Sequence, residues 1–100
     1  MPEFKLQYRF SSVPWKYSGP AGWYFVSLPK KISKEIRTHF KSVEQGWGRL
    51  PAKIKMGSTE WQSAIWFDTK QDTYLLPLKA AVRKKEGLTE GKKTTVTIFL

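Results

Sequence analysis

Short segments in which apolar and polar residues alternate, separated by glycine and proline, most constrain the fold of this chain. From Glu3 to Phe10 every second residue is aromatic or aliphatic, which is the period of a strand with one buried face. Residues 11–22 carry two prolines and two glycines and are expected to form a loop. Further strands are expected over residues 23–28, 49–56, 60–67, 74–78 and 93–100. The pattern predicts a mainly β protein.

Two segments have the spacing of helices instead. After Pro29, apolar residues recur at every fourth position as far as Phe40, so we expect an amphipathic helix of about three turns. A second short helix is expected over Lys79–Glu86, closed by Gly87. The predicted order is β-β-α-β-β-β-α-β. A small closed β-barrel is an economical way for short strands in this order to cover their apolar faces.

A chain of 100 residues is long enough for one hydrophobic core, so we expect a single domain over residues 1–100. There is no cysteine, which excludes disulfides and thiolate metal sites. No apolar run approaches the ~20 residues that span a bilayer, and the first residues do not resemble a signal peptide. We therefore expect a cytoplasmic protein with no membrane association.

Comparing the chain with itself at an offset of 50 residues gives a weak internal repeat. Tyr24–Leu28 matches Tyr74–Leu78, and the helical residues that follow also match. Phe4-Lys5-Leu6 falls on Ile54-Lys55-Met56. Duplication of a ββαβ unit would give a barrel with pseudo-two-fold symmetry. Two unrelated strand–helix units could match by chance, so the sequence leaves both explanations open.

The chain is strongly basic, with 18 Lys and Arg against 8 Asp and Glu and a net charge of +10. Such a charge favours anionic partners, although a well-solvated surface is the simpler explanation. Residues 30–41 and 79–93 each carry a net charge of +4. The candidate residues for binding anions or nucleic acid are Lys30, Lys31, Lys34, Arg37, Lys79, Arg83, Lys84 and Lys85. The sequence leaves open whether they share one face.

Catalytic signals are weak. His39 is the only histidine, and the carboxylates are scattered. One histidine cannot complete a zinc site, and no positioned serine accompanies it for nucleophilic catalysis. We expect a protein that is not an enzyme and that has no metal site and no cofactor.

The aromatic residues allow two interpretations. Exposed rings could stack on nucleobases, as in proteins that bind single strands, but alternation along strands should turn most of them into the core. The residues concerned are Trp23, Tyr24, Trp47, Trp61, Trp66 and Phe67. Those expected at the mouth of a ligand pocket are Trp15, Tyr17, Trp47 and Trp61.

Several segments together resemble the bacterial DUF1905 family. They follow the family's order over nearly the whole chain and comprise Gly22–Pro29, Gly46–Arg49, Thr59–Trp61, Tyr74–Lys84 and Gly87–Gly91. The resemblance implies a monomeric double-split β-barrel in a family without an established activity. It also puts Lys92 where the family usually has an acidic residue.

A more distant resemblance links Leu78–Ile98 to the swapped-hairpin unit of AbrB-type transcription factors and antitoxins. Those proteins pair two units in a dimer and bind DNA through basic residues. Only Arg83 and Arg37 are candidate counterparts here. We therefore expect a module, monomeric or weakly dimeric, that binds a small ligand or a protein, with nucleic-acid binding as the alternative.

Overall fold

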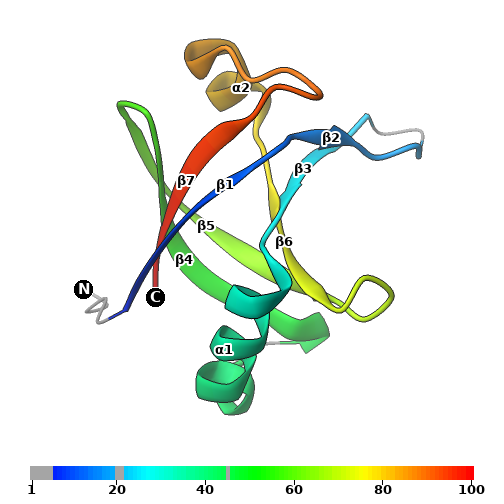
Figure 1. Ribbon diagram of the computed structural model, residues 1–100, viewed down its shortest axis with the longest axis vertical. Coiled ribbons are helices and arrows are strands. Elements are labelled where there is room, and N and C mark those ends of the chain that lie inside the picture. The colour runs from blue at the N-terminus through cyan, green and yellow to red at the C-terminus, as the bar shows by residue number, and fades with distance from the viewer. Residues whose placement is uncertain (1–5, 20–21, 45) are drawn as a thin grey trace.

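The computed structural model describes residues 6–19, 22–44 and 46–100 and is mainly β (Figure 1). Its α-helices are α1 (Lys30–Phe40) and α2 (Ala80–Glu86). Two short 3-10 helices, Lys41–Val43 and Gly46–Gly48, follow α1 along the chain. The strands are β1 (Gln7–Ser12), β2 (Trp15–Lys16), β3 (Tyr24–Ser27), β4 (Arg49–Met56), β5 (Thr59–Asp68), β6 (Thr73–Pro77) and β7 (Thr94–Phe99). The predicted order of strands and helices is confirmed except for β2.

Strand β2 lies inside the segment that we predicted to be a loop, and β1 extends two residues beyond Phe10. Pro14 separates β1 from β2 and is itself buried. A proline has no amide hydrogen to donate, so it interrupts a strand without ending the extended course of the chain. The predicted break after Phe10 is therefore two residues too early, and the resumption of the strand at Trp15 is missed.

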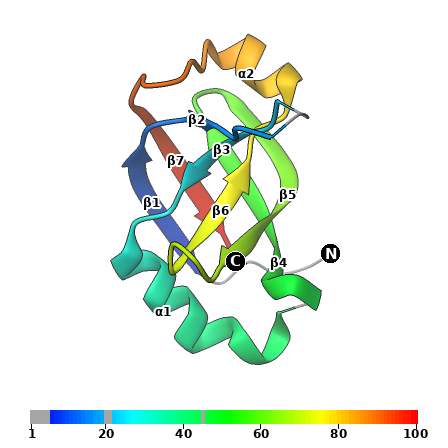
Figure 2. The same ribbon diagram turned by 90° about the vertical axis from the view of Figure 1, so that its right-hand side faces the viewer.

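The strands form one antiparallel sheet in the order β1-β7-β4-β5-β6-β3-β2. The sheet curves into an open half-barrel (Figure 2), so the expected closed barrel is not what the strand pairing shows. At the open side, Ser12 Oγ donates to the carbonyl oxygen of Ser27 at 2.9 Å. A side chain makes this contact because the Val13-Pro14 step ends the β1 backbone ladder.

The strand register can be compared with the 50-residue offset of the internal sequence repeat. Val26 of β3 pairs with Leu76 of β6, 50 positions further along the chain. A two-fold axis that passes between β3 and β6 and relates halves offset by 50 residues would give this register. Ile54 of β4 pairs with Ile98 of β7, 44 positions away, so the offset changes along the chain. One reason is that α2 has seven residues and α1 has eleven.

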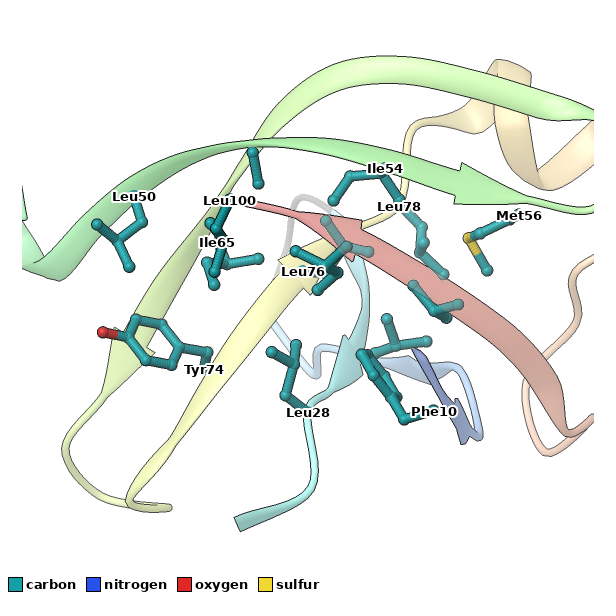
Figure 3. Close-up of a cluster of buried hydrophobic side chains, with 14 of the residues drawn as sticks. Phe10, Leu28, Leu50, Ile54, Met56, Ile65, Tyr74, Leu76, Leu78 and Leu100 are labelled. Atoms are coloured by element: carbon teal, nitrogen blue, oxygen red, sulfur yellow. The ribbon is translucent and has the colours of Figure 1, made fainter. Parts of the chain in front are cut away.

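The core lies on the concave side of the sheet (Figure 3). Alternate residues of β4 point into it, as the period of a strand requires, and they are Leu50, Ala52, Ile54 and Met56. Helices α1 and α2 lie at opposite ends of the half-barrel in both ribbon views. Ile36 of α1 and Val82 of α2 are buried, so each helix contributes an apolar side chain to the interior.

A chain of hydrogen bonds joins α1 to β6 and to the end of β3. The Tyr74 amide donates to Ser33 Oγ at 3.0 Å, and the Ser33 and Thr73 hydroxyls are 2.6 Å apart. The Thr73 hydroxyl donates to the carbonyl oxygen of Leu28. Because a hydroxyl has one proton, Ser33 must be the donor to Thr73. The order of donors is thereby fixed along the whole chain.

Candidate functional site

Among the described residues, six large hydrophobic side chains are exposed, and three of them lie together on the outer side of the sheet. They are Tyr17, Trp23 and Trp66. There they border a cavity of about 490 Å³ over β3, β5, β6 and the segment between β2 and β3. We call it the aromatic groove; its lining residues are Tyr17, Trp23, Phe25, Trp66, Leu75 and Pro77.

The alternation of the strands explains why these residues face outward. In β3, Tyr24 and Val26 pack on the core, so the side chains of Trp23 and Phe25 project to the other side. In β5, Trp66 is exposed between Ile65, which is buried, and Phe67, which packs on the core. Both strands therefore carry apolar residues on both faces.

The rings of the groove are packed around Phe25. The ring centroid of Trp15 lies 5.2 Å from that of Phe25, and Trp23 stacks on Phe25 at 6.4 Å. Tyr17 meets the same ring edge-on at 6.4 Å. Trp15 Nε1 donates to Ser27 Oγ at 2.9 Å, which anchors one ring to β3. The cluster is thus held in place by its own contacts.

Two further cavities continue from the groove, one after the other. The side groove, of about 370 Å³, shares three residues with it and adds Trp15, Lys16, Ser18, Asp68, Lys70 and Gln71. The hydroxyl pocket, of about 580 Å³, shares Lys70 and Gln71 with the side groove and adds Ser11, Ser12, Ser27, Leu28, Pro29, Lys30 and Thr73. The surface thus changes along its length from apolar to polar and basic.

The structure brings together only part of the predicted ligand pocket. Trp15 and Tyr17 both contact Phe25. Trp61 lies apart from them, opposite Ile54 on β4, and packs on the core with its Nε1 buried and without a partner among the described residues. The side chain of Trp47 lies outside the described part of the structure.

The expectation that Trp23 and Trp66 belong to the core is wrong. Their exposed fractions are 55% and 37%, because core residues occupy the neighbouring positions of the same strands. Tyr24 and Phe67 do pack on the core, as expected. Sequence reasoning missed five groove residues, Trp23, Phe25, Trp66, Leu75 and Pro77. The available signal was that residues 23–28 are apolar on both faces.

The candidate basic residues do not share one face. Those of α1 and those at α2 lie at opposite ends of the molecule (Figures 1 and 2). The guanidinium of Arg37 sits 3.7 Å from the centroid of Phe67, and that of Arg83 sits 3.9 Å from the centroid of Tyr24. The six candidate lysines are exposed: Lys30, Lys31, Lys34, Lys79, Lys84 and Lys85.

Ionisable groups give little support for catalysis. Burial, followed by the hydrogen bond to Glu44, raises the pKa of Tyr74 well above its ordinary value. Lys53 Nζ lies 2.8 Å from Glu60 Oε1 and lowers the pKa of that carboxyl. His39 is exposed on α1. Within residues 6–19, 22–44 and 46–100, no three His, Asp or Glu side chains gather where they could hold a metal ion.

The sequence profile of a family described as a domain of unknown function, DUF1905, matches residues 10–98. The chain belongs to the DUF1905 family. The DUF1905 match includes every residue of the aromatic groove. No curated protein matches the chain.

The predicted membership of DUF1905 is therefore confirmed. The more distant resemblance to AbrB-type domains stays a prediction. In the described part of this DUF1905 chain, neither α-helix has the length and apolar character needed to cross a membrane.

Proposed function

We propose that this DUF1905 protein is a non-enzymatic binding module that holds an apolar or aromatic part of a small ligand or protein in the aromatic groove. The exposure of Trp23, Tyr17 and Trp66, at 55%, 51% and 37%, carries the proposal. Apolar side chains grouped around a concave surface are typical of binding sites, whereas single exposed ones are common everywhere.

The packing of the groove supports binding at low entropic cost. Trp15, Tyr17 and Trp23 already contact Phe25, and Trp15 is hydrogen-bonded to Ser27. A partner that covers these rings would therefore immobilise few additional side-chain torsions. Preorganised aromatic surfaces of this kind gain affinity because less conformational freedom is lost on binding.

The proposal extends to the origin of the scaffold. Two related ββαβ units in a double-split barrel would explain why Val26 pairs with Leu76, 50 residues away. It would also explain why each half places a helix after a short strand. We further propose that the protein acts in the cytoplasm, since a chain without cysteine has no need of an oxidising compartment.

Binding of the neutral apolar dye Nile red tests the groove. Its fluorescence should rise on addition of the protein, and Trp23→Ala and Trp66→Ala should each weaken dye binding at least 5-fold. Val43→Ala is the matched control, because Val43 is 61% exposed and lines none of the three cavities. Equal dye binding by the wild type and both tryptophan variants would contradict the proposal.

A further inference from the structure

We infer that the aromatic groove and its two adjoining cavities bind a short single-stranded nucleic acid. Its bases would stack on the exposed rings, and its phosphates would lie against the neighbouring lysines. The inference rests on the proposed function in using the same groove as a binding site, and it replaces the small ligand or protein proposed above by a single strand as the occupant.

The exposed rings offer what a nucleobase requires. Trp23 and Trp66 border a floor made by Phe25, Leu75 and Pro77. Every base has an aromatic face, and stacking on a protein ring contributes about 1–3 kcal/mol per base. Within the described residues, Trp23 Nε1 and Trp66 Nε1 donate no hydrogen bond. These donors remain available to base or phosphate oxygens.

The charges along the cavities match a polyanion. Lys16 and Lys70 line the side groove, and Lys30 joins Lys70 in the hydroxyl pocket. The one carboxylate in the three linings is Asp68, whose Oδ1 accepts the Lys70 amide at 3.0 Å. None of the three lysines forms an ion pair with another described residue. With a net charge of +10, the surface attracts phosphates.

The order of the cavities distinguishes a single strand from other partners. Apolar rings, lysines and hydroxyl groups follow one another across shared residues, as planar bases and charged phosphates do along a nucleic acid. A duplex keeps its base faces stacked inside and offers none to the rings. A neutral apolar peptide would cover the rings but would leave Lys16, Lys30 and Lys70 without partners.

This placement moves the nucleic-acid surface away from the basic helices, apart from Lys30 at the start of α1. The lysines of α1 and α2 lie at opposite ends of the molecule, and Arg37 and Arg83 already stack on protein rings. A strand bound in the groove needs neither α2 nor the arginines. Lys85, exposed on α2, is therefore a matched control for Lys70.

Fluorescence anisotropy of labelled (dT)10 measures the affinity directly. Trp23→Ala and Trp66→Ala should each weaken binding about 5- to 150-fold, as expected for the loss of one stacked base. Trp23→Phe should retain part of the affinity because it keeps a ring. Lys70→Ala should weaken binding and make the slope of log K against log salt shallower by about 0.7. Lys85→Ala and Val43→Ala should not reduce the affinity beyond a small, uniform effect of charge.

Three results with nucleic acids would overturn the inference. They are the absence of (dT)10 binding at low salt, equal binding of a duplex of the same length, and unchanged (dT)10 binding by folded Trp23→Ala and Trp66→Ala. Tighter binding of an acidic, proline-containing peptide than of (dT)10 would also overturn it, in favour of a protein partner. If Nile red binding depends on Trp23 and (dT)10 binding does not, the inference fails and the proposed function stands. If neither depends on it, both fail.

Discussion

Replacing Ser33 by alanine tests whether the buried hydroxyl chain holds α1 against the sheet. Ser33 is fully buried and accepts the Tyr74 amide at 3.0 Å. The Tyr74 carbonyl oxygen accepts from the Leu28 amide, just after β3, at 2.9 Å. Both backbone polar groups of Tyr74 are therefore paired, the amide with α1 and the carbonyl with the end of β3. Alanine at position 33 therefore removes the acceptor of a buried amide.

The expected loss follows from these contacts. A buried amide without an acceptor costs about 1–3 kcal/mol, and the Thr73 hydroxyl also loses the donor 2.6 Å away. We expect the free energy of unfolding to fall by about 2 kcal/mol. In a domain of this size that change lowers the Tm by about 8–16 °C. Urea denaturation and a thermal melt measure both quantities.

The matched control is Thr38→Ala on the same helix. The Thr38 hydroxyl is exposed and donates to the carbonyl oxygen of Lys34 at 2.9 Å, so its loss should change the free energy of unfolding by less than about 0.5 kcal/mol. Amide exchange at Tyr74 should accelerate in Ser33→Ala and not in Thr38→Ala. If the two variants are equally stable and equally protected, the hydroxyl chain does not stabilise the fold and the reasoning is wrong.

Two further predictions concern other parts of the core and the hairpin. The pKa of Tyr74 is raised in the folded protein from an ordinary value of 10.0, so its contribution to stability is present below about pH 10 and is lost as the pH rises further. Denaturation at a series of alkaline pH values should show the free energy of unfolding falling less steeply in Tyr74→Phe than in the wild type. An equally steep fall in the two proteins would contradict this. Gly57 and Gly87 both have positive φ, but a Cβ at Gly57 would clash with the Glu86 carboxylate, while one at Gly87 would meet nothing within 4 Å. The Glu86 carboxylate would have to move away and give up the hydrogen bonds it accepts from Ser58 and Thr59. Urea denaturation should therefore show Gly57→Ala to be about 1 kcal/mol more destabilising than Gly87→Ala, and the difference should vanish in a Glu86→Ala background.

The positions of the strands and helices could be predicted because the signals are local. The alternation from 49 to 56 required only the period of a strand, and the structure has β4 over the same residues. The helix after Pro29 followed from apolar spacing and the fixed φ of proline. Membership of DUF1905 followed from short motifs, each of neighbouring residues, in a fixed order along the chain.

The candidate site could be predicted only in part. Trp15 and Tyr17 were predicted at the pocket mouth because they lie among glycines and prolines. In the structure both contact Phe25. Trp23 and Trp66 were assigned to the core because a large apolar residue in a strand usually faces inward. Their strands are apolar on both faces, and periodicity alone does not say which face meets the core.

The sequence by itself determined the spacing of strands, helices and breaks, because each depends on neighbouring residues and on backbone geometry. It also determined the excess of positive charge. The tertiary structure decided that the two basic helices lie at opposite ends and that the sheet remains open between its edge strands, β1 and β2. It also decided that Trp23 and Trp66 border one groove. These features depend on the register and curvature of strands far apart in the chain, which only long-range pairing sets.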